Sequence, residues 1–470
     1  MTVPREAFTD AAVTAAALAA CFLAWLVFWD LGAIGLVSHD WPKEAYYYDV
    51  LREALTAGRL PFYIDRDAQG TSWFLAIPEV PVSPQLLLLP LLPNGAFATA
   101  NGIILWLVGV AGCLLYRRRY QVAMVPFLFV LFLFSFNGHI IGHLAVGHSM
   151  WVGYFLSPFA ILATFRLVEG STSSRDALLL GLVLAGMMLQ GAFHLAVYFA
   201  LLAGVLALLA PRRLAAPVAL AFAACGLLAA VKIVPALLAF GEFDRSFMSG
   251  YPGLGIFLDG LTAVRPTDTP PLGSFTEHRL GWWEYDAYLG VAGLLFVTVF
   301  AFRPLKGQRD GWLLLVQACL VLIVLSFGEV IYLLSLLHVP VLGQERVASR
   351  IFVAPLVCLL FLAGRGYTER AGNAASPSDG RPPAVSVLAV LGLALTIGGL
   401  LAHLLEWRIV TLEAAPREPW QLHMLEVIPS PFYERLWLGS LALSVIAWIA
   451  AVSYLITRRR LPDLCEARIP

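Results

Sequence analysis

The chain is poor in charged residues and has no paired cysteines. Asp, Glu, Lys and Arg make up 13% of its 470 residues, about half the share found in soluble domains. The 31 basic and 31 acidic residues balance, so no nucleic-acid partner is indicated. The six cysteines have no CxxC or other paired spacing, which argues against a disulfide framework and a cysteine-bound zinc. No glycine-rich phosphate loop marks a soluble nucleotide-sugar domain.

Apolar residues dominate instead, at 60% of the chain with a mean hydropathy of +0.79. Apolar runs of roughly 17–25 residues recur, and each is long enough to cross a hydrocarbon core of about 30 Å. The first run, 11–37, is too long for the apolar part of a signal peptide and lacks a convincing cleavage site, so we expect it to be retained. The sequence predicts an all-α polytopic membrane protein.

Basic clusters recur after every second apolar run, which places them on one side of the membrane, the cytoplasmic side, together with both termini. We expect about twelve helices, at 11–37, 96–116, 121–137, 149–168, 176–191, 193–210, 214–240, 285–303, 311–328, 349–365, 383–405 and 436–457. A catalytic core is predicted at 1–365, a cytoplasmic linker at 366–382, and C-terminal helices with a tail at 383–470. The outward segments 38–95, 138–148, 241–284, 329–348 and 406–435 hold most of the polar residues suited to chemistry.

The first outward segment carries three candidate catalytic carboxylates, Asp40, Glu44 and Glu79. Pro42 suits the first turn of an amphipathic helix that ends near Gly58, with His39 or Asp40 at its N-cap. Asp40 is interpreted either as that N-cap or as a general base that accepts a proton from a hydroxyl group. Glu44 and Glu79 are alternatives for the base, or solvated acids.

Three histidines follow at spacings of four and five residues, at positions 139, 143 and 148. Histidine pairs at this spacing can bind zinc. No HExxH motif accompanies them, so a divalent metal is left open but not indicated. We interpret His143 and His148 as hydrogen-bond donors to a phosphate or sugar, with a purely structural role as the alternative.

Three basic residues are candidates for binding a phosphate. Lys232 lies within an apolar run, where a charged side chain is costly and suggests function, although it can also extend toward the interface. Arg346 and Arg350 share one helical face, and guanidinium groups suit phosphate oxygens. An ion pair with Glu284 or Glu345 is the alternative for these arginines.

Aromatic residues with one acid precede the eighth predicted helix, at Trp283, Glu284 and Tyr285. They suit an interfacial aromatic belt or a surface on which a sugar stacks. Together with His39, His143 and His148, we expect them to contact substrate.

An ordered set of short motifs resembles the YfhO-like membrane proteins of the GT-C glycosyltransferase superfamily. The motifs are His39-Asp40 through Arg59-Leu60-Pro61, Pro78-Glu79 to Leu89, Gly142-His143 to Pro158, Val231 to Pro235, Trp283-Glu284-Tyr285 with Tyr288-Leu289-Gly290, and Arg346 to Arg350. The resemblance implies a GT-C-like fold, a polyprenyl-phosphate-linked sugar as donor, and Asp40 as catalytic base in the first extracytoplasmic loop. Lys232 departs from the pattern, which more often has Gln there.

The sequence therefore predicts an inverting, polyprenyl-phosphate-sugar-dependent glycosyltransferase in a cytoplasmic membrane of bacterial type. Its active site would face outward, and its acceptor would be a lipid, a glycan or a protein. A transporter or flippase of a lipid-linked or anionic substrate is the alternative, with Lys232 beside the helix-breaking Pro235 on the transport path. A non-catalytic membrane scaffold is the third interpretation.

Overall fold

A computed structural model describes residues 5–66, 70–170, 174–240, 250–265, 280–303, 309–337, 345–374, 384–414 and 429–465. This part of the chain is almost entirely helical, which confirms the predicted class. Eight of its helical segments are long and apolar enough to cross a membrane: Thr9–Phe28, Asn94–Tyr120, Met124–Ala145, Ser149–Val168, Pro211–Leu228, Ala348–Arg370, Val387–Glu413 and Pro431–Thr457. The chain is a multi-pass membrane protein.

The elements of the first half are α1 (Arg5–Phe28), η1 (Asp30–Gly32), α2 (Trp41–Thr56), β1 (Tyr63–Arg66), β2 (Gly70–Trp73), η2 (Phe74–Ala76), η3 (Pro84–Leu91), α3 (Asn94–Tyr120), α4 (Met124–Phe136), α5 (Gly138–Ala145), η4 (Ser149–Leu156), α6 (Ser157–Val168), α7 (Ser174–Leu189), α8 (Phe193–Leu209) and α9 (Pro211–Leu228). The antiparallel hairpin β1–β2 pairs Tyr63 with Trp73 and Arg66 with Gly70.

The elements of the second half are α10 (Ala230–Phe240), α11 (Leu254–Thr262), η5 (Trp282–Glu284), α12 (Gly290–Ala301), α13 (Arg309–Leu325), α14 (Gly328–Leu336), η7 (Ala348–Phe352), α15 (Val353–Ala374), α16 (Ala384–Glu406), α17 (Ile409–Glu413) and α18 (Pro431–Cys465). Each of the twelve predicted apolar ranges contains a helix, although the number of membrane crossings stays a prediction.

Three of the differences from the predicted bounds concern α1, α9 with α10, and α15. Helix α1 ends at Phe28 rather than near 37, because Asp30 and Leu31 adopt positive φ angles that an α-helix cannot continue. The range 214–240 is broken at Ala229 into α9 and α10, where the backbone N–H of Val231 donates to the Ser444 hydroxyl instead of a helical carbonyl. Helix α15 continues to Ala374, so the first part of the segment predicted as a linker is helical.

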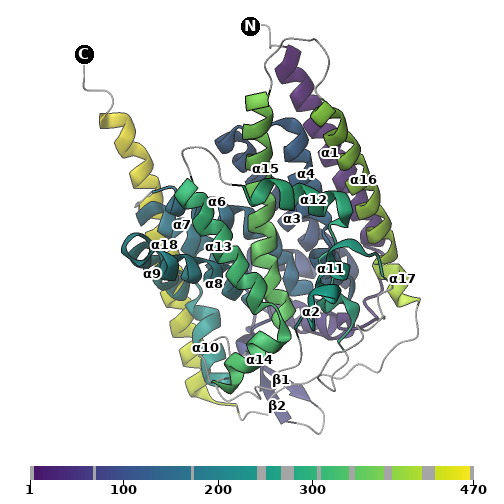
Figure 1. Ribbon diagram of the computed structural model, residues 1–470. Coiled ribbons are helices and arrows are strands. Elements are labelled where there is room, and N and C mark those ends of the chain that lie inside the picture. The colour runs from purple at the N-terminus through teal and green to yellow at the C-terminus, as the bar shows by residue number, and fades with distance from the viewer. Residues whose placement is uncertain are drawn as a thin grey trace.

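Helix α15 runs through the centre of the bundle, with α12, α4 and α13 packed around it (Figure 1). An 18-residue apolar window within Ala348–Arg370 is 94% buried, whereas the corresponding windows of Thr9–Phe28 and Pro431–Thr457 are each 17% buried. The first and last long helices therefore lie at the periphery, where their exposed apolar side chains suit contact with lipid.

The first described residue of α1 and the last of α18 lie at the same end of the bundle, and the β-hairpin lies at the opposite end (Figure 1). Two basic residues of the predicted cytoplasmic clusters belong to the end that holds the termini. Arg117 pairs with Asp10 of α1 at 2.6 Å, and Arg365 pairs with Glu169 at 2.8 Å. Which side of a membrane this end faces remains the prediction made from charge.

Candidate active site

Asp40 directly precedes α2, and its position is set by backbone contacts. His39 adopts a positive φ of 49°, which turns the chain, and the Asp40 N–H donates to the carbonyl of Val146 at 3.0 Å. Asp40 occupies the N-cap position of α2, but its side chain makes no capping hydrogen bond. The predicted N-cap position is therefore confirmed, but the carboxylate does not cap the helix. Its carboxylate instead contacts Lys43 at 3.6 Å and His148 at 3.5 Å.

A close approach of two segments explains why Asp40 and His148 meet. Gly147 has a φ of +90°, and a Cβ atom there would lie 2.4 Å from the backbone nitrogen of Trp41. Only glycine allows this approach. The Trp41 indole N–H donates to the carbonyl of Ala145 at 3.1 Å, which fixes the start of α2 on the end of α5.

Lys43 lies among all three predicted catalytic carboxylates. Its ammonium is 2.6 Å from Glu79, 3.4 Å from Glu44 and 3.6 Å from Asp40. The structure thus brings Asp40, Glu44 and Glu79, the three alternative candidates for the base, together around a lysine that the sequence analysis missed. The sequence did hold a signal for this lysine: Lys43 comes three residues after Asp40 and next to Glu44, a spacing at which side chains on a helix can interact.

The three carboxylates differ in exposure. The Asp40 side chain is 49% exposed, that of Glu79 26%, and that of Glu44 only 2%. Burial raises the pKa of Glu44 to about 7, against the opposing effect of Lys43. Burial also raises the pKa of Asp40, with Lys43 again opposing it. Burial alone would lower the pKa of Lys43, but the surrounding carboxylates raise it well above its ordinary value.

Two of the three predicted histidines form a pair, His143 from α5 and His148 from the turn that follows it. The Nδ1 atoms of His143 and His148 are 2.6 Å apart, and the His143 ring stacks on Trp151 with centroids 4.1 Å apart. His139 is buried and packs edge-on against His143. Burial and the nearby Arg350 lower the pKa of His148 well below its ordinary value, so this imidazole is neutral.

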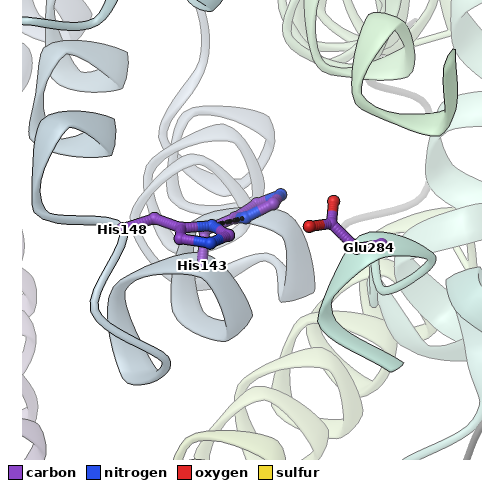
Figure 2. Close-up of side chains that lie close together, drawn as sticks. All are labelled: His143, His148 and Glu284. Carbon is purple, nitrogen blue, oxygen red and sulfur yellow. Dashed lines mark hydrogen bonds between the residues drawn. The ribbon is translucent and has the colours of Figure 1, made fainter. Parts of the chain in front are cut away.

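Arg350, in η7 just before α15, forms the ion pair with Glu284 that was the alternative to phosphate binding. Its Nε donates to Glu284 Oε2 at 2.7 Å, and a second guanidinium nitrogen donates to Oε1. The indole N–H of Trp283 donates to the same carboxylate at 3.2 Å. Figure 2 shows the Glu284 carboxylate directed toward the imidazoles of His143 and His148. One ligand atom from each of the three lies within 4.8 Å of the others, so they are the residues able to hold a metal.

The other predicted substrate and phosphate residues occupy different surroundings. The His39 ring packs edge-on against Trp283, with centroids 5.2 Å apart, so both border the carboxylate cluster. Arg346 is exposed, four residues before Arg350. Tyr285 is fully buried beside Trp282 and belongs to the core.

Lys232 is 3% exposed and contacts the protein backbone. Its ammonium donates to the carbonyl of Ile77 at 2.6 Å and faces that of Leu75 at 3.4 Å. These contacts tie α10 to the segment that leads into Glu79. A role in binding donor phosphate stays a prediction, while a role in positioning this segment follows from the contacts.

Sequence reasoning missed a second buried acid–base pair. His403 Nε2 lies 2.8 Å from Asp286 Oδ2, and both side chains are fully buried. Asp286 Oδ1 also accepts the backbone N–H of Tyr288, and the Tyr288 ring stacks on His403 with centroids 4.8 Å apart. The pair fixes α16 to the segment that carries Glu284. The signal available in the sequence was His403 itself, a histidine in the last turn of the apolar helix α16.

No protein-family model matches this sequence, and no curated protein sequence shows significant similarity to it. Among solved structures, the chain is similar to a cryo-EM structure of the arabinofuranosyltransferase AftD from Mycobacteria, at 16% identity and a TM-score of 0.46. The match covers 85% of this chain and 28% of that one, so the chain spans less than a third of the length of AftD. A similarity of this size assigns no residue role and no substrate to the present protein.

Proposed function

We propose that the protein is a membrane glycosyltransferase that moves a sugar from a polyprenyl-phosphate donor to a lipid, glycan or protein acceptor. One observation carries the proposal: the carboxylate of Asp40, with its side chain 49% exposed, lies beside His148 and Lys43 just before α2. Such an acid, held but accessible, is suited to remove a proton from an acceptor hydroxyl.

Asp40 is the best of the three candidate bases. Glu44 is buried, accepts a hydrogen bond from Ser149 and is out of reach of a bound acceptor. Glu79 is held by the ammonium of Lys43 at 2.6 Å. Among the described residues, the side-chain ion-pair contacts of Asp40 involve its Oδ2 atom, and we assign Oδ1 as the atom that accepts the proton.

The proposed reaction is a single displacement. The acceptor oxygen attacks the anomeric carbon as Asp40 takes its proton, and the bond from that carbon to the lipid-phosphate oxygen breaks with inversion. The leaving phosphate carries negative charge, which a nearby cation would stabilise. Arg346, an exposed residue shortly before α15, is the first candidate for this role. Arg350 contributes once its pairing with Glu284 loosens. We place this transfer in an outward-facing site of a bacterial-type cytoplasmic membrane.

The test is sugar transfer by purified Asp40→Asn protein supplied with a panel of polyprenyl-phosphate sugars. Loss of a general base lowers turnover by about 100-fold to 10,000-fold, so we expect a fall in kcat of this size with little change in KM. Glu53→Gln is the matched control, because Glu53 is an exposed acid on the same helix that pairs only with Arg59 in the described structure. Unchanged turnover in Asp40→Asn would remove Asp40 from the role of base.

The same assay separates the transferase from the transporter. If wild-type protein turns over no donor in the panel but moves a lipid-linked sugar across vesicles, the transport interpretation replaces the proposal. In that case Arg346→Ala should reduce transport. For a transferase, the same substitution should weaken donor binding while the protein stays folded.

A further inference from the structure

We propose that His143, His148 and Glu284 form a binding site for one divalent transition-metal ion, for which zinc is the best match. The three residues come from α5, the turn after it and η5, and Figure 2 shows their side chains converging. Two imidazoles and one carboxylate are the protein ligands of several catalytic zinc sites, which keep a fourth position open for substrate. Imidazole ligands disfavour magnesium and calcium, which prefer oxygen atoms alone.

The distances suit an ion after a small adjustment. The ligand atoms lie within 4.8 Å of one another, and ligands of a tetrahedral zinc with bonds of about 2.1 Å are about 3.4 Å apart. The Nδ1 atoms of His143 and His148 are 2.6 Å apart in a hydrogen-bond contact, which is closer than two ligand atoms of one ion. Binding therefore replaces this contact, and small side-chain rotations bring both imidazoles and the Glu284 carboxylate to the ion.

Two further observations point to an ion. The contact between the histidines uses one nitrogen of each ring, and the Nε2 atom of His143 is buried with no hydrogen-bond partner among the described residues. An unpaired buried polar atom is costly, and coordination would satisfy it. In addition, Asp40 lies 3.5 Å from Nε2 of His148, and a carboxylate beside a ligand histidine is a regular feature of metal sites.

An ion here would also change Arg350. Among the contacts described for Glu284, the guanidinium of Arg350 is its cationic partner, so coordination would draw the carboxylate toward the ion and weaken this pair. In this way the ion would release Arg350 to bind the donor phosphate. The open coordination position of the ion would accept an oxygen of the same phosphate. This consequence rests on the proposed transferase function, whereas the binding of the ion does not.

The test is direct metal binding by the purified full-length protein, without donor. After equilibrium dialysis against Zn²⁺, we expect about one ion per chain by mass spectrometry, and Co²⁺ should give the visible absorption of a four-coordinate ion. His148→Gln and Glu284→Gln should bind at least about 100-fold more weakly. His194→Gln is the matched control, because His194 packs near Trp151 but lies outside the set, and it should bind normally.

Two outcomes would overturn the proposal: wild-type protein that retains no ion, or His148→Gln with wild-type loading. Where His148→Gln does not fold, Asp40→Asn replaces it, and about 10-fold to 100-fold weaker binding is expected from loss of this neighbouring carboxylate. Absent binding together with normal sugar transfer would refute the metal site alone. Normal binding together with absent transfer would refute the transferase alone.

Discussion

Replacing Glu44 with glutamine should make the stability of the protein less sensitive to pH. The side chain is 2% exposed, and burial raises its pKa to about 7 from an ordinary value of 4.5. Between these two values the folded state holds a proton that the unfolded state has released, so stability falls as pH rises. Between the two pKa values, each pH unit lowers the free energy of unfolding by about 1.4 kcal/mol, so the loss amounts to about 3 kcal/mol by pH 8.

The amide introduced by Glu44→Gln would be neutral at every pH and would still accept the hydrogen bond that Ser149 donates to Glu44. Thermal unfolding in detergent of wild type and Glu44→Gln, at pH 5 and at pH 8, measures the effect. We expect the variant to gain stability relative to wild type by about 3 kcal/mol between these conditions. Glu53→Gln should show no such gain, because Glu53 is exposed. An equal difference at both pH values would refute the assignment of a protonated, buried Glu44.

Three further predictions concern the surroundings of the site. Arg350→Met should destabilise the protein by about 3–5 kcal/mol, because it leaves Glu284 buried without its partner, and the double variant with Glu284→Met should recover most of this loss in thermal unfolding. Gly191→Ala should lower the unfolding temperature sharply, since its φ is +81° and a Cβ would lie 2.1 Å from the carbonyl oxygen of Glu79; a silent substitution would contradict this geometry. Lys232→Met should cost about 1–3 kcal/mol because it removes the ammonium from the carbonyls of Leu75 and Ile77, of which only that of Ile77 keeps a second donor, the N–H of Val80, among the described contacts; weaker donor binding at unchanged stability would instead favour its phosphate role.

The sequence alone was enough for the class of protein and the position of its helices. Long apolar runs are local features, and each predicted run contains a helix because a chain in lipid must satisfy its backbone hydrogen bonds within each segment. It also brought out Asp40, Glu44 and Glu79 as one group, since two of them lie within one turn of a helix that Pro42 starts. The ends of α1 and α9 were harder, because they depend on backbone angles at Asp30 and on a distant hydroxyl at Ser444.

Tertiary structure decided which partner each polar side chain meets. Arg350 was open to a phosphate or a carboxylate, and the tertiary fold placed Glu284 of η5 beside it. Asp286 and His403 lie 117 positions apart in the chain, and no local pattern joins them. Asp40 holds the N-cap position expected from the sequence, but its contact with His148 depends on the close approach of the chain at Gly147. Long apolar runs determine where the helices form. The charged side chains near the helix ends find their partners only after the helices have packed.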